Sequence, residues 1–210
     1  MSKHLVIIGA GMAAGRLVEH VTDQGGWDVT QFNAEPRGTY DRIMLSPVLA
    51  GDKTYAEIVT HDATFYEARG VTCRFGERVQ GIDRAAKTVT GPDGVPLPYD
   101  KLVIATGSDP FIIPLPGHDL EGVIAYRDLE DTERMMAMTD GEKAVVIGGG
   151  LLGLEAAAGM HARGIDVTVV HLMGHLMERQ LDEAAGYLLR KELVGRGIKV
   201  LCSSNSKESR

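Results

Sequence analysis

The N-terminal stretch Leu5–Gly15 constrains the fold more than any other part of this chain. Four apolar residues, Leu5–Ile8, lead into the motif Gly9-Ala10-Gly11-Met12-Ala13-Ala14. This order is typical of a buried parallel strand that turns into the first helix of a βαβ unit. The second glycine lets the backbone approach a pyrophosphate, and the N-terminus of the helix favours an anion. We therefore predict a nucleotide-phosphate loop that contains Gly9, Gly11 and Ala14.

An acidic residue follows the second strand of the same unit. The apolar spacing predicts a helix over 12–23 and a strand over 27–32. Glu35 comes just beyond that strand, about 20 residues after the glycine motif, where a carboxylate can accept hydrogen bonds from the ribose hydroxyls of an adenosine. We predict this contact for Glu35; the alternative is a solvated loop glutamate.

The same pattern occurs a second time at residues 145–155. Three apolar residues precede Gly148-Gly149-Gly150-Leu151-Leu152-Gly153, and Glu155 follows. One such motif also occurs in ordinary turns, whereas two in one chain indicate two dinucleotide-binding units. The alternative is an internal structural repeat that binds no ligand.

The remaining pattern completes one lobe and begins another. Residues 38–54 lack a clear period and are a candidate wall of the first cofactor pocket. The first lobe then has a predicted helix at 62–68, a strand at 71–75, a small antiparallel meander over 78–99, and a strand at 101–105 that ends in Thr106-Gly107. Three prolines stiffen residues 109–117, which we interpret as a linker.

The second lobe repeats the alternation of strands and helices. Strands are predicted at 142–147, 166–170 and 198–202, and helices at 128–139, 154–163 and 181–194. Residues 203–210 contain no apolar side chain and are predicted to be disordered. The fold class is therefore α/β, with Rossmann-like lobes at 1–117 and 118–202 and a tail at 203–210. The second lobe is expected to be incomplete at its C-terminus.

Composition excludes several classes of function. The net charge of −7 argues against a protein that binds the backbone of nucleic acids. Cys73 and Cys202 form no Cys-x-x-Cys motif, and the histidines show no metal-ligand spacing, so we expect no redox disulfide and no metal site. No apolar run is long enough to span a membrane, and we expect a cytoplasmic protein.

Three blocks of sequence carry a resemblance to a known family. They are residues 35–51, which include Tyr-Asp-Arg-Ile-Met-Leu-Ser-Pro, residues 148–157, and Leu-Met-Glu-Arg-Gln-Leu-Asp at 176–182. With the two glycine motifs, they resemble the pyridine nucleotide-disulfide oxidoreductase superfamily. Within it, they are most similar to the N-terminal flavoprotein part of the large subunit of NAD(P)H-dependent assimilatory nitrite reductases. The resemblance extends over about residues 4–202.

The resemblance implies FAD at the first motif and NAD(P)H, with NADH favoured, at the second. For FAD it implies the residues Gly9, Gly11, Ala14, Glu35, Arg42, Ser46, Val79, Thr106 and Gly107. For the nicotinamide nucleotide it implies Gly148, Gly150, Gly153 and Glu155. His171 is also expected to bind this nucleotide, since it stands where the resemblance implies an NAD-selective acid. A neutral imidazole can hydrogen-bond a ribose hydroxyl, whereas a protonated one could favour a 2′-phosphate, so the choice between NADH and NADPH stays open.

The implied activity is hydride transfer from NAD(P)H to FAD, with electrons passed on toward nitrite reduction in nitrate assimilation. The cofactors carry this chemistry, so no side chain is assigned as catalytic or as a metal ligand. The family's siroheme and iron–sulfur cluster belong to domains that this chain lacks. We therefore expect a truncated electron-input module that passes electrons to a downstream redox domain or small subunit. The chain can form oligomers, and on its own it can be inactive.

Two alternatives stay open at this point. One is a flavoprotein reductase that serves a ferredoxin or rubredoxin. The resemblance implies lysine after the Leu-Ser pair in such reductases, and this chain has Pro47. The other is a non-catalytic remnant that binds a nucleotide without turning it over.

Overall fold

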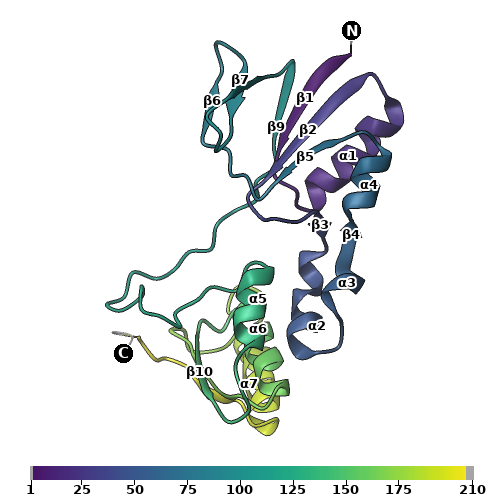
Figure 1. Cartoon of the computed structure of the whole chain (residues 1–210). Coiled ribbons are helices and arrows are strands. Elements are labelled where there is room, and N and C mark those ends of the chain that lie inside the picture. The colour runs from purple at the N-terminus through teal and green to yellow at the C-terminus, as the bar shows by residue number, and fades with distance from the viewer. Residues whose placement is uncertain (1, 207–210) are drawn as a thin grey trace. The chain divides into compact units, whose positions relative to one another are not determined.

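The computed structural model describes residues 2–206 and divides into two compact units. One unit contains residues 2–42 and 55–108, and the other contains residues 43–54 and 109–206 (Figure 1). The sequence pattern predicts a boundary after residue 117, with residues 43–54 in the first lobe. The structure differs because the side chain of Leu49, within 43–54, is completely buried in the core of the second unit.

A parallel sheet in the order β5-β2-β1-β9 forms the centre of the first unit (Figure 1). Its strands are β1 (Lys3–Ile8), β2 (Trp27–Asn33), β5 (Thr72–Phe75) and β9 (Lys101–Ile104). Because β1 is central, its residues Leu5–Ile8 are buried on both faces of the sheet. The predicted strand–turn–helix unit at the N-terminus therefore lies in the middle of the fold.

Two layers cover this sheet. The helices α1 (Met12–Gln24) and α4 (Ala63–Ala68) supply Val18 and Tyr66 to the face that carries Leu5 and Ile7. The opposite face carries Val6 and packs against the predicted meander, which consists of β6 (Gly81–Asp83), β7 (Thr88–Thr90) and β8 (Pro96–Pro98).

Residues 38–61 hold a series of short elements that the sequence pattern did not predict. They are β3 (Thr39–Tyr40), the 3₁₀ helix η1 (Arg42–Met44), α2 (Leu45–Ala50), α3 (Tyr55–Ile58) and β4 (Val59–His61). Elements this short complete too few turns or alternations to produce a recognisable period. β3 and β4 pair with each other in the first unit, whereas α2 belongs to the second.

The second unit is built on the parallel sheet β10-β11-β12. Its elements are β10 (Lys143–Ile147), β11 (Asp166–Val170), β12 (Lys199–Leu201), α5 (Leu129–Met136), α6 (Leu151–Ala162) and α7 (Glu183–Gly195). Helix α6 begins three residues earlier than the helix predicted at 154. The buried side chains Ala157, Val169 and Leu193 join the helices to one face of the sheet.

The other face of this sheet is open within residues 2–206. Val145 is 65% exposed, Ile147 43% and Leu201 50%, although all three are apolar strand residues. The register places Ile147 and Leu201 on the same face of the sheet, on either side of Val170. The second unit therefore has a one-sided core.

The segment predicted to be disordered begins with ordered backbone. The N–H groups of Ser203 and Ser204 donate to the carbonyl oxygens of Met173 and His171, at 2.9 and 3.0 Å. The predicted disorder therefore does not extend to these two residues. Residues 207–210 lie outside the described part of the chain.

Candidate functional site

Helix N-termini distinguish the two glycine motifs from the helices α4, α5 and α7. The helices α4, α5 and α7 begin with Asp62, Asp128 and Asp182, whose carboxylates each accept a backbone N–H of the first turn. The helices α1 and α6 begin instead with Gly11 and Gly150, without a side-chain cap. Their first-turn N–H groups are thus left for another acceptor, and phosphate is a suitable one.

The first loop is held by the strands on both sides of β1. The N–H of Gly9 donates to the carbonyl oxygen of Phe32 at 2.7 Å, at the end of β2. On the other side, a Cβ at Gly9 would lie 2.3 Å from the carbonyl oxygen of Ala105, and Gly9 has φ +109°. Only glycine satisfies both conditions. Apart from Gly11 and its two chain neighbours, no atom of the described chain lies within 4 Å of a Cβ built at Gly11, so the space beside this residue is open to a ligand.

The other first-unit candidates surround this loop in different ways. Ala14 is completely buried and lets α1 pack on the sheet. Thr106 and Gly107 are exposed beyond the end of β9, and the backbone N of Thr106 would be 3.0 Å from a Cβ at Gly9. Val79 is half-buried against the meander side of the sheet. Of these four, Thr106 adjoins the loop most directly.

Glu35 is held by two neighbouring side chains. The hydroxyl of Tyr40 donates to its Oε2 at 2.8 Å, and the guanidinium of Arg42 is ion-paired with its Oε1. Arg42 also lies over the ring of Tyr40, 5.1 Å from its centroid. The structure therefore joins two predicted site residues, Glu35 and Arg42, in one cluster. Tyr40 was not among the predicted residues, because nothing in the local pattern indicates its direction.

The second loop also requires glycine because of a close backbone contact, but at the helix side of the loop. A Cβ at Gly153, in the first turn of α6, would lie 2.2 Å from the carbonyl oxygen of Gly148. The N–H of Gly148 donates to the carbonyl oxygen of Val170, at the end of β11, at 2.9 Å. At Gly150 the space next to the backbone is open among residues 2–206. Gly153 thus closes the loop on its helix, while Gly150 exposes the backbone.

Ser46 and Glu155 form part of one cluster in the second unit. The Ser46 hydroxyl donates to Oε2 of Glu155 at 2.7 Å, and it lies 3.0 Å from the hydroxyl of Tyr126. Burial raises the pKa of Tyr126 above its ordinary value. The resemblance implied separate roles for Ser46, beside FAD, and Glu155, in the nicotinamide loop. Tyr126 was missed because it lies in an irregular segment without a motif.

This cluster leads to a prediction about stability. Replacing Ser46 with alanine removes a hydrogen bond to a charged group, and we expect a loss of about 1–3 kcal/mol from the unfolding free energy. Tyr126→Phe removes only a bond between two hydroxyls and is expected to cost about 1 kcal/mol or less. Thermal unfolding of both variants tests this order; a larger loss in Tyr126→Phe contradicts it.

His171 lies beneath the second loop. Its side chain is 8% exposed, Nδ1 accepts the N–H of Gly149 at 3.1 Å, and Nε2 lies 3.1 Å from Oε2 of Glu178. A Cβ at Gly149 would be 2.8 Å from Cγ of His171. The predicted direct contact between this imidazole and a ribose would need one of these two contacts to be broken.

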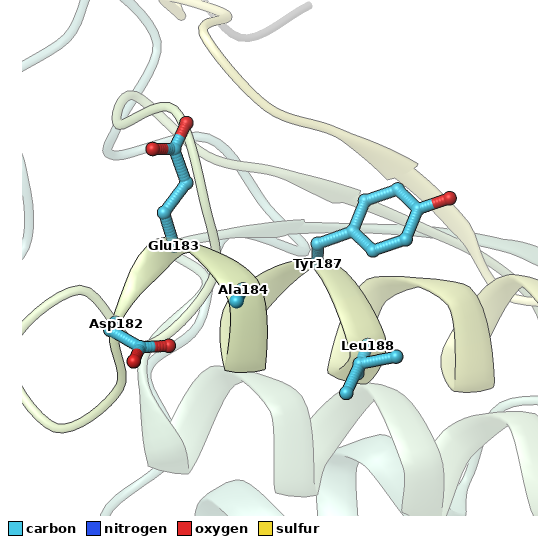
Figure 2. A pocket seen from close by; sticks show the side chains of 5 residues that line it. All are labelled: Asp182, Glu183, Ala184, Tyr187 and Leu188. Carbon is cyan, nitrogen blue, oxygen red and sulfur yellow. The ribbon is translucent and has the colours of Figure 1, made fainter.

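A surface hollow lies elsewhere in the second unit. Figure 2 shows the side chains that line it along the first half of α7: Asp182, Glu183, Ala184, Tyr187 and Leu188. None of them belongs to a glycine loop. In the described part of the chain, no cluster of histidine, cysteine or carboxylate side chains could hold a metal ion, and no helix is long and apolar enough to cross a membrane.

This chain is similar to known proteins over nearly its whole length. Residues 3–210 match the family described as pyridine nucleotide-disulphide oxidoreductase. The chain is 46% identical, over 98% of its length, to nitrite reductase [NAD(P)H] of Bacillus subtilis, and 40% identical, over 97%, to an assimilatory nitrate reductase electron transfer subunit of the same organism. It spans 26% and 27% of those two proteins, about a quarter of their length.

A solved structure supports the fold. A NAD-dependent persulfide reductase from A. fulgidus matches 99% of this chain with a TM-score of 0.92 and 27% sequence identity. This chain covers 41% of that protein. The predicted α/β class, with parallel sheets and a small antiparallel sheet, is confirmed.

Proposed function

Because the chain belongs to the pyridine nucleotide-disulphide oxidoreductase family, we propose that it is the electron-input flavoprotein module of a nitrite-reducing enzyme. It takes electrons from NAD(P)H through FAD and passes them toward nitrite reduction. The observation that carries the proposal is the pair of glycine-capped helices, α1 and α6, each with an open N-terminus behind a parallel strand. The 46% identity to a nitrite reductase supports the proposal that the electrons pass toward nitrite reduction.

The residues present fit the two cofactors. In the first unit, the backbone at Gly11 and the N-terminus of α1 would hold the FAD pyrophosphate. Glu35, oriented by Tyr40 and Arg42, would accept hydrogen bonds from the adenosine ribose. The remaining FAD positions in this unit would be Gly9, Ala14, Val79, Thr106 and Gly107. Ser46 is proposed as a residue beside the flavin whose hydroxyl is oriented by Glu155.

In the second unit, the backbone at Gly150 and the N-terminus of α6 would hold the pyrophosphate of NAD(P)H. Gly148 and Gly153 shape this loop. Bound together, the two cofactors supply hydride transfer, which moves two electrons and a proton from nicotinamide to flavin. The chain's own residues bind and orient these groups, and none is required as an acid, base or nucleophile.

The proposed electron acceptor is a downstream redox domain or a small subunit. Siroheme and an iron–sulfur cluster would act there. A cytoplasmic location is part of the proposal. A ferredoxin or rubredoxin as acceptor is the less favoured alternative, since Pro47 stands where such reductases are expected to carry lysine.

One experiment tests the proposal directly. The purified chain is incubated with FAD, freed of unbound flavin, and examined for a flavin absorbance spectrum before and after anaerobic addition of NADH. We expect a yellow protein that NADH bleaches. A protein that cannot retain FAD contradicts the flavoprotein assignment for this chain, and a yellow protein that NADH leaves unchanged contradicts the reductase activity.

A further inference from the structure

The segment that follows β11 folds back along the second loop. The N–H of Gly149 donates to Nδ1 of His171 at 3.1 Å, and its carbonyl oxygen accepts the N–H of Met177 at 2.9 Å. Both polar backbone groups of Gly149 are therefore bonded to residues 171–177. Met177 has φ +52°, an uncommon conformation for a residue with a side chain, and the chain changes direction there. Glu178 comes next in the chain, and its carboxylate contacts the ring of His171.

The hydrogen bonds of His171 define its tautomer. Nδ1 accepts a hydrogen bond from the N–H of Gly149, so Nδ1 carries no proton itself, and the ring proton of a neutral imidazole must be on Nε2. Nε2 then donates to Oε2 of Glu178 across 3.1 Å. A single imidazole ring thus links the loop backbone to the Glu178 carboxylate.

In this arrangement, Glu178 supplies the acidic group that is expected at position 171, at the end of β11. In a dinucleotide-binding unit, a carboxylate at that point accepts hydrogen bonds from the adenosine ribose of NAD. His171 occupies the position, but its ring is buried and bonded on both sides. The Glu178 side chain is 28% exposed and is anchored to the same ring. It is the carboxylate that the fold brings to this end of the strand.

We propose that Glu178 accepts the ribose hydroxyls of the nicotinamide dinucleotide and thereby selects NADH over NADPH, with His171 as its positioning residue. This inference rests on the function proposed above, because it concerns the nucleotide bound at the second loop. A carboxylate accepts hydrogen bonds from the two free hydroxyls of NADH. It repels the 2′-phosphate of NADPH, since both groups carry negative charge.

The charge state of Glu178 supports this role. Its own backbone N–H, followed by His171 and Arg179, holds the pKa of Glu178 below its usual range. The carboxyl group is therefore ionised at neutral pH. Arg179 is exposed and next in the chain, so its positive charge could favour a 2′-phosphate instead.

The test is a pair of binding titrations on the full chain. NADH and NADPH are titrated separately, and binding is followed by the fluorescence of the reduced nicotinamide. We expect wild-type protein to bind NADH at least about tenfold more tightly than NADPH. Glu178→Gln keeps the shape and an acceptor for Nε2 of His171 but removes the charge, and we expect the preference to fall to about threefold or less.

Two further variants test whether the charge of Glu178 and its contact with His171 cause the preference for NADH. Glu183→Gln removes the same charge from an exposed position in the first turn of α7 and is expected to keep the wild-type preference (Figure 2). His171→Phe keeps a ring but breaks both contacts, and it is expected to reduce the preference as Glu178→Gln does. If His171 acted only in packing, its replacement would weaken the binding of NADH and NADPH equally and leave the ratio of the two affinities unchanged.

The outcomes separate this inference from the proposed function. If wild-type protein binds neither nucleotide, the second loop is not a nicotinamide-nucleotide site and the proposed function fails with it. If wild-type protein binds NADH but Glu178→Gln keeps the full preference, only the role of Glu178 is overturned. A wild-type preference for NADPH also overturns it and points to Arg179.

Discussion

Replacing Gly150 with aspartate is expected to abolish NADH binding while leaving the second unit folded. Gly150 has extended backbone angles, φ −84° and ψ 178°, that any residue can adopt. Aspartate is a favourable residue at this position of a helix and is expected to stabilise α6 by a few tenths of a kcal/mol over glycine. Its carboxylate, however, would occupy the N–H groups that the pyrophosphate needs and would repel it. We expect at least a hundredfold weaker binding, which corresponds to about 2.7 kcal/mol.

Titration with NADH and thermal unfolding of the same protein measure these two effects separately. Gly11→Asp, at the start of α1, is the matched control: it should weaken FAD binding and leave NADH binding unchanged, because Gly11 belongs to the other unit. If Gly150→Asp bound NADH as tightly as wild-type protein, the N-terminus of α6 would not be the pyrophosphate site. Loss of folding in this variant would contradict the open space seen at Gly150.

Replacing Gly9 with alanine is expected to destabilise the first unit more than any other single methyl group added to its loop. The new Cβ would lie 2.3 Å from the carbonyl oxygen of Ala105 and 3.0 Å from the N of Thr106, both of them backbone atoms. The residue would also have to keep φ +109°. Overpacking and backbone strain together are expected to cost about 3 kcal/mol. For a unit of this size, the unfolding temperature would fall by roughly 12 °C or more.

Gly11→Ala is the control for this prediction. It adds the same methyl group two residues away, where the backbone is extended and where the described residues leave open space. We expect its unfolding temperature to stay within about 3 °C of wild type. Thermal unfolding without added cofactor measures both variants, so that weaker FAD binding does not contribute. Equal unfolding temperatures for the two variants would show that the loop can move away from β9 at little cost.

The helices and strands of both glycine units were predictable because their signals are local. A buried strand, the glycine spacing and the apolar face of the next helix all lie within about 20 residues, and each depends on backbone angles and periodicity. The same holds for the meander, which turns back on itself over short loops. The short elements between 38 and 61 were not predictable, since their position depends on partners distant in the sequence.

The assignment of residues 43–54 shows this limit most clearly. In sequence they follow the first nucleotide-binding unit directly, which predicts that they form a wall of its cofactor pocket. In the structure, Leu49 fills the space above Gly159 of α6, where a Cβ would lie 2.7 Å from its Cγ. Ser46 reaches Glu155 from the same segment. An apolar helix of one and a half turns carries no information about which core will bury it.

By itself, the sequence determined that this chain contains two strand–glycine–helix units, which residues form their loops, and which family it resembles. These properties follow from local backbone geometry and from motif spacing. Only the tertiary structure decided the side-chain contacts around the predicted site residues: Tyr40 and Arg42 with Glu35, Ser46 with both Tyr126 and Glu155, and His171 between Gly149 and Glu178. The direction of a side chain depends on packing and hydrogen-bond partners from other segments, and a linear pattern does not contain them.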